Sequence, residues 1–103
     1  MKSTGPLDPM GDVSIPFNRI VLNPNDGFDL GVMAPTTLVK IYSSESIDAF
    51  ESGEGYFADG QLLQENSCKI GTAIMGMRTL QSIHMPKQIR LHMVDNRLLV
   101  SPL

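Results

Sequence analysis

The chain has 103 residues, of which 42% are hydrophobic and 18% are charged, and its net charge at pH 7 is −3. This length suits a single domain. One cysteine excludes an internal disulfide and any zinc module built from several cysteines. The acidic balance argues against a dedicated nucleic-acid-binding protein.

The first 35 residues hold five of the seven prolines. Proline fixes φ and has no backbone N–H, so it interrupts helices and central strands. We therefore predict an extended N-terminal arm over residues 1–35, of which residues 1–12 are flexible. Residues 13–22 alternate well enough to form an edge strand, and the apolar side chains there need a partner surface. These candidate assembly residues are Val13, Ile15, Phe17, Ile20 and Leu22.

The N-terminus lacks the apolar stretch of a secretory signal, because proline, aspartate and glycine follow Lys2 closely. No apolar run in the chain approaches the length of a membrane span. We therefore expect a cytoplasmic protein, or one in a particle that is assembled in the cytoplasm, such as a virion. We expect no contact with a membrane.

Residues 36–103 are expected to form a compact β-domain. Residues 36–44 are rich in β-branched and aromatic side chains, which favour a strand. The apolar spacing then changes and predicts one short helix near residues 45–52, which ends at Gly53. Asp59–Gly60 is typical of a two-residue turn, so we expect a hairpin formed by the residues on either side of it.

The C-terminal residues form the clearest pattern in the chain. With Asp95–Asn96 as the turn of a hairpin, Met93 lies opposite Leu98 and Leu91 lies opposite Val100. Together with the preceding elements, this hairpin predicts a mainly β fold, a small sandwich or barrel. No internal repeat is evident in the sequence. The expected inward face consists of Ile89, Leu91, Met93, Leu98 and Val100, and the outward face of Arg90, His92 and Leu99.

The segment from Cys68 to Met93 contains one cysteine, four methionines and two histidines, which are soft or borderline metal ligands. Their spacing matches no metal motif, and strand neighbours such as His92 and Met93 point to opposite faces. We interpret the methionines as core or interface residues. A metal site and a Cys68–histidine nucleophile are the alternatives. We expect no catalytic residue, no metal and no cofactor.

The charges are distributed unevenly along the chain. Residues 1–60 carry three basic and nine acidic groups, whereas residues 61–103 carry five basic and two acidic groups. One interpretation is that an acidic region of one copy meets a basic region of the next. The alternative is an ordinary solvated surface. The candidate interface charges are Glu51, Glu54, Asp59, Arg78, Arg90 and Arg97.

These observations favour a non-enzymatic structural or assembly protein. We expect a small β-rich subunit of a homo-oligomer or of a larger particle, for example a virion decoration (cement) protein, whose N-terminal arm contacts its neighbours. Its partners would be copies of itself, a larger protein assembly, or both, and nucleic acid is not expected. The alternative is a small acidic inhibitory or ligand-sequestering module that acts on a basic protein partner.

Overall fold

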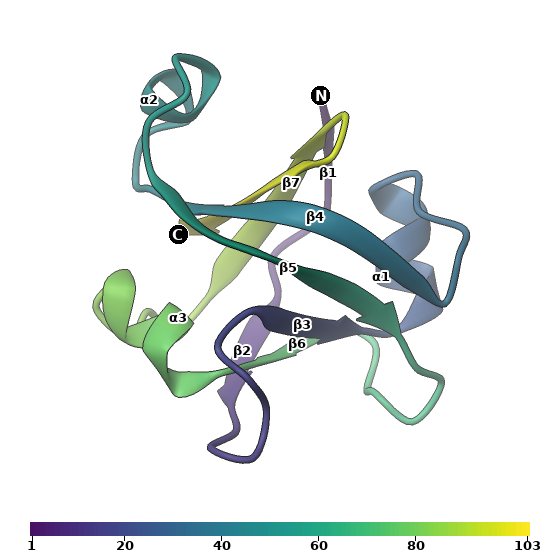
Figure 1. The fold of residues 1–103 in the computed structure, drawn as a ribbon. Coiled ribbons are helices and arrows are strands. Elements are labelled where there is room, and N and C mark those ends of the chain that lie inside the picture. The colour runs from purple at the N-terminus through teal and green to yellow at the C-terminus, as the bar shows by residue number, and fades with distance from the viewer.

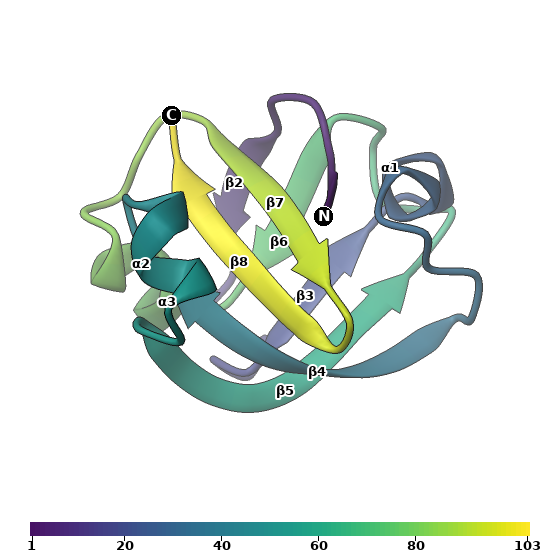
Figure 2. The same cartoon turned by 90° about the horizontal axis from the view of Figure 1, so that it is seen from above.

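A computed structural model describes all residues of the chain, Met1–Leu103. Eight strands form one strongly curled sheet in the order β1-β7-β8-β4-β5-β3-β6-β2, and three short helices lie outside it (Figures 1 and 2). The predicted mainly β fold is therefore confirmed, but it has three short helices where the sequence predicted one. The elements are β1 (Lys2–Ser3), β2 (Asp8–Gly11), β3 (Arg19–Leu22), α1 (Pro24–Asp29), β4 (Thr36–Ser43), α2 (Ile47–Glu51), β5 (Tyr56–Gln64), β6 (Thr72–Met75), α3 (Met77–Ser82), β7 (Ile89–Val94) and β8 (Arg97–Pro102).

The N-terminal segment connects the two ends of the sheet. β1 pairs antiparallel with β7, and Leu7 forms a bridge with Ile89 on the same strand. β2 then pairs in parallel with β6 at the other end of the strand order. The sheet is thus curled almost into a barrel, which encloses the main core on its concave side.

The two halves of the chain are interleaved. If the chain is divided within the loop after α2, at residue 53, six of the seven strand pairs join a strand of the first half to one of the second. The exception is the β7–β8 hairpin, which lies within the second half. No strand of the first half pairs with another strand of that half, so the first half has no sheet of its own.

The structure also contains an internal repeat that the sequence did not reveal. β3, α1 and β4 begin at Arg19, Pro24 and Thr36, and β6, α3 and β7 each begin 53 residues later. The parallel pair Asp8↔Thr72 corresponds under this shift to the parallel pair Gln61↔Arg19. Aligned with this offset, residues 8–43 and 61–96 share only two identical residues, Ser14/Ser67 and Leu38/Leu91.

The repeat extends to the way in which the helices end. Gly31 and His84, 53 residues apart, both have positive φ, at 75° and 64°. The backbone N–H that follows each of them donates to the carbonyl of Gly27 or Leu80, respectively, in the preceding helix. Such left-handed residues close a helix by satisfying its last carbonyls. The same backbone geometry is therefore produced twice by different side chains.

The main core confirms the predicted inward face of the C-terminal hairpin. Met93 pairs with Leu98 and Leu91 pairs with Val100, and all four side chains are buried. The helix expected near residues 45–52 is α2, which covers Leu99 on the outward face of the sheet. The hairpin thus has apolar neighbours on both faces.

Several expectations about the N-terminal half were wrong. Ile20 and Leu22 are fully buried in β3, a central strand between β5 and β6, so they are not available to a partner. Residues 1–35 belong to the same sheet as the rest of the chain, and residues 1–12 contain two of its strands. The arm and the compact domain that we expected are one unit.

The prolines suggested an extended arm, but Pro9 and Pro24 lie at positions where the missing N–H does not interrupt a helix or a central strand. Pro24 is the first residue of α1, where a missing N–H is harmless, and Asn23 caps that helix. Pro9 lies in β2, which has a ladder partner on one side only.

The hairpin expected at Asp59–Gly60 was also wrong, because β5 is one continuous strand from Tyr56 to Gln64. Gly60 has a different role there. A Cβ at Gly60 would collide with the carbonyl oxygen of Asn18, so the glycine allows the loop before β3 to approach β5.

Two leucine substitutions distinguish a core strand from an arm. Leu22→Ala should lower the free energy of unfolding by about 2–5 kcal/mol, because it leaves a cavity in the core. Leu38→Ala, on the exposed face of β4 where 72% of the side chain is accessible, should change it by less than about 0.5 kcal/mol. Urea unfolding of both variants tests this, and equal small effects would contradict the core position of β3.

Candidate functional site

The loop between β2 and β3, residues 12–18, projects from one end of the curled sheet (Figure 1). The Asp12 carboxylate accepts hydrogen bonds from the Ser14 hydroxyl at 2.6 Å and from the Ser14 N–H at 2.8 Å. These bonds lower the pKa of Asp12, that from the hydroxyl contributing most. The turn is thus fixed by its own side chain, as in other Asx turns.

The other end of this loop is anchored on α3. The buried Thr79 hydroxyl donates to the Phe17 carbonyl at 2.7 Å. Gly76 lies directly against the loop, and a Cβ there would be 2.7 Å from the Phe17 Cα. The loop backbone is therefore held between its Asx turn and the first turn of α3.

This anchored loop presents apolar side chains to solvent. Val13 is 91% exposed and Phe17 is 37% exposed. The Arg78 guanidinium lies 4.6 Å from the centroid of the Phe17 ring, and Phe57 packs against the same ring edge-on at 5.9 Å. Together with Ile15, Met77 and Arg78, the loop lines a shallow hollow of about 230 Å³. We call this the loop surface and define it by Val13, Ile15, Phe17, Met77 and Arg78.

The second half of the chain has an equivalent loop, residues 65–71, between β5 and β6. The Asn23 side-chain amide donates to the Cys68 carbonyl at 2.8 Å, and the Gly71 N–H donates to the Asp26 carboxylate at 2.9 Å. Both anchoring side chains belong to the first turn of α1 or its cap. Nearby, Phe28 is exposed. The repeat thus anchors both loops on a helix start, with different hydrogen-bonding groups.

The structure brings together residues that the sequence suggested separately. Phe17 was predicted as an assembly residue and Arg78 as an interface charge, and they are in contact. Val13 and Ile15 lie beside them. The sequence did not predict Met77, which belongs to this surface, or Phe57, which packs against Phe17. The sequence pattern that indicates this surface is the alternation of apolar residues at positions 13, 15 and 17.

The remaining candidate charges do not form one site. Glu51 and Glu54 are exposed at α2 and the loop after it. Asp59 accepts a hydrogen bond from the Tyr56 hydroxyl at 2.8 Å and pairs with Lys40 at 3.4 Å. The Tyr56 hydrogen bond, followed by that from Lys40, lowers the pKa of Asp59. Asp59 is thus already engaged within the chain.

Arg97 holds α2 in place. Its guanidinium lies 4.9 Å from the Phe50 ring centroid and 5.9 Å from that of Tyr42, and it donates to the Phe50 carbonyl at 3.3 Å. Arg97 therefore has a structural role within the chain, which is to hold α2. Arg90 is half-buried on β7, and its Nε has no hydrogen-bond partner.

The soft-ligand segment is divided between core and surface. Cys68 is buried, its Sγ lies 3.5 Å from the Thr72 carbonyl oxygen, and burial raises the pKa of its thiol. Met75 and Met93 belong to the main core, whereas Met85 is exposed. No group of three or more histidine, cysteine, aspartate or glutamate side chains is arranged to hold a metal ion.

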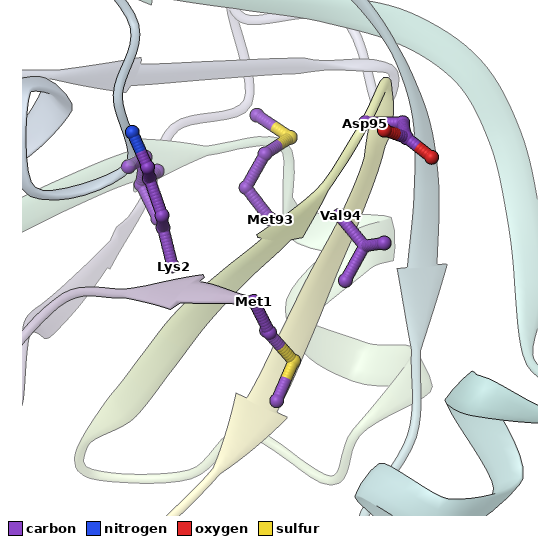
Figure 3. A pocket seen from close by; sticks show the side chains of 6 residues that line it. Met1, Lys2, Met93, Val94 and Asp95 are labelled. Carbon is purple, nitrogen blue, oxygen red and sulfur yellow. The ribbon is translucent and has the colours of Figure 1, made fainter.

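Figure 3 shows a hollow of about 360 Å³ where β1 meets the β7–β8 turn. Its side chains do not converge: Lys2 and Met93 extend to one side of the paired strands, and Met1 and Val94 extend to the other. The hollow is therefore a gap between a strand and a turn, without the convergent polar groups that fix a ligand.

His92 is the buried titratable group beside this hollow. It is 5% exposed, and its Nδ1 lies 2.6 Å from the Ser3 hydroxyl on β1. Burial, followed by the charge of Arg90, lowers the pKa of His92. Both causes disfavour the charged imidazolium in the folded chain.

Comparisons with known proteins do not assign the site. No protein-family model matches the chain, and neither the curated proteins nor the solved structures searched contain a match. None of the helices is long and apolar enough to cross a membrane.

The lowered pKa of His92 predicts a pH dependence of stability. The unfolded chain binds a proton at His92 near the ordinary pKa of about 6.5, whereas the folded chain binds it only at lower pH. The unfolded state then holds more protons, so stability falls as the pH drops below about 6.5. Urea unfolding between pH 7.5 and 5.5 should show this loss.

Two variants test that assignment. His92→Gln should remove this part of the pH dependence, and Arg90→Gln should reduce it because the neighbouring positive charge is gone. If the loss of stability is unchanged in His92→Gln, other groups cause it.

Proposed function

We propose that this chain is a non-enzymatic assembly subunit that contacts other protein chains through the loop surface. The observation that carries the proposal is the exposure of Val13 and Phe17 on a backbone that is fixed at both ends. A fixed loop loses little conformational entropy when a partner covers it, so more of the gain from apolar burial appears as affinity.

The composition of the loop surface supports the same proposal. Aromatic residues, methionine and arginine are enriched in the centres of protein interfaces. Phe17, Met77 and Arg78 provide one of each, and Arg78 already lies over an aromatic ring. This arrangement buries the apolar stem of the arginine and keeps its charge available at the rim.

The curled sheet favours side-chain contacts over strand donation. β3, β4, β5, β6, β7 and β8 each have neighbours on both sides, and the segment containing β1 and β2 connects the two ends of the sheet. Adding a strand from another chain requires an open edge, and the two strands with a partner on one side only, β1 and β2, have just two and four residues. We therefore replace the expected arm exchange by docking on the loop surface, in a homo-oligomer or on a larger particle such as a virion.

A second candidate function rests on the acidic surface around α2. Between Lys40 and Lys69 the chain has no basic residue, and the carboxylates near α2 are exposed. Such a surface favours a basic protein partner, as in an inhibitory or sequestering module. These exposed carboxylates are Glu45, Asp48, Glu51 and Glu54.

A pair of matched variants tests the loop surface. Val13→Asp should reduce the average mass of the protein at a given concentration, because it places a charge in the contact. Met33→Asp makes the same charge change at a side chain that is 79% exposed elsewhere, and should leave the mass unchanged. Sedimentation equilibrium measures both.

Neither substitution touches the core, so both variants should unfold at the wild-type temperature to within about 2 °C. A wild-type chain that stays monomeric up to millimolar concentration would contradict the proposal of homo-assembly. It would leave the basic partner as the next candidate to test.

A further inference from the structure

The isolated chain leaves almost all of its charges without an ion-pair partner. It has eight lysine and arginine residues and eleven aspartate and glutamate residues. The structure contains one salt bridge, between Lys40 and Asp59. Some of the other charged groups are engaged within the chain without an ion pair, such as Asp26 with the Gly71 N–H and Arg97 with the Phe50 carbonyl. Glu51, Glu54 and Lys87 are exposed and take part in no ion pair.

These exposed charges are separated by sign over two helices, which lie above and below the same ends of β4 and β5 in Figure 1. The acidic group lies on α2 and its flanks, where Glu51 and Glu54 are exposed. The basic group lies on α3 and the loop that follows it, where Arg78 and Lys87 are exposed. From Asn66 to Val94 the chain contains no acidic residue.

The two helices lie at the same end of the curled sheet (Figure 2). The hydroxyl of Ser82, the last residue of α3, is 3.2 Å from the hydroxyl of Ser43, the last residue of β4 before α2. Arg78 also joins the basic group to the loop surface through its contact with Phe17. This end of the sheet thus carries an acidic helix and a basic helix, and the loop surface adjoins the basic one.

We propose that two copies of the chain form a two-fold dimer in which α2 of each copy contacts α3 and Lys87 of the other. In such an interface the same patch is used by both copies, so a patch with one acidic and one basic part is complementary to itself. The inference rests on the proposed function of the loop surface in homo-assembly, and adds the partner and its orientation.

The charges would mainly set the orientation and the rate of association. Exposed ion pairs contribute little individually, but like charges placed opposite each other are strongly unfavourable. The apolar side chains of the loop surface beside these charges would supply the buried apolar area of the interface. Raising the ionic strength should therefore weaken the dimer without abolishing it.

Charge reversal provides the test, with dimerisation measured by sedimentation velocity. One variant, Glu51→Lys with Glu54→Lys, gives these two positions the sign of Arg78 and Lys87, and the other, Arg78→Glu with Lys87→Glu, gives those two positions the sign of Glu51 and Glu54. Each variant alone should dimerise at least about tenfold more weakly than the wild type. An equimolar mixture should form a heterodimer, because both contacts then join opposite charges.

A control variant tests whether the effect is specific to the proposed interface. Lys69→Glu has the same charge change as Lys87→Glu, but lies in the loop between β5 and β6, across the molecule from α2 and α3 in Figure 1. It should leave dimerisation unchanged. Circular dichroism should show the wild-type spectrum for every variant, because the substituted side chains are exposed.

Two results would overturn the inference, and they have different consequences for the proposed role of the loop surface. If the wild type associates but neither reversal weakens it and mixing has no effect, this dimer is wrong while the loop surface keeps its proposed role. If the wild type is monomeric at all concentrations, homo-assembly itself is wrong.

Discussion

The structure depends on the hydrogen bonding between the two halves of the chain. Every strand of the first half finds its ladder partners in the second half. A strand without a partner leaves its backbone groups unpaired, and a single sheet face without a core cannot bury its apolar side chains. Neither the core nor the sheet therefore exists until both halves are in place.

This interleaving also creates the candidate site. Each half passes a loop across the other half, and each loop ends on a helix of the other half. The carbonyl of Phe17 is fixed by Thr79, which is 62 residues away in the sequence. The main core on the concave side of the sheet does not include the apolar side chains of this loop. The exposure of Val13 and Phe17 thus accompanies a loop that is anchored outside the core.

The sequence predicted the C-terminal hairpin and α2, but it did not predict α1 or α3 and wrongly predicted a hairpin at Asp59–Gly60. The C-terminal hairpin and α2 depend on neighbouring residues, and both patterns were read correctly. Residues 13–22 were read as an edge strand because their proline and alternation suggested one. Only residues 19–22 belong to β3, and their burial depends on β5 and β6, which are distant in the sequence.

The candidate site was predicted in part for the same reason. Phe17 and Arg78 were both singled out, but no local pattern shows that residues 61 positions apart will stack. Arg97 was predicted as an interface charge. Its contact with Phe50 could not be predicted, because it depends on the position of α2 in the fold. The internal repeat escaped notice because its two copies conserve backbone geometry with almost no identical residues.

The most direct test of this account is to divide the chain at the exposed loop between Gly53 and Glu54 and to study the two fragments by NMR. Interleaving predicts that residues 1–53 and residues 54–103 are each unfolded alone, and that an equimolar mixture recovers the dispersed spectrum of the intact chain. A fragment that folds cooperatively by itself, with its own protected strands, would contradict the account.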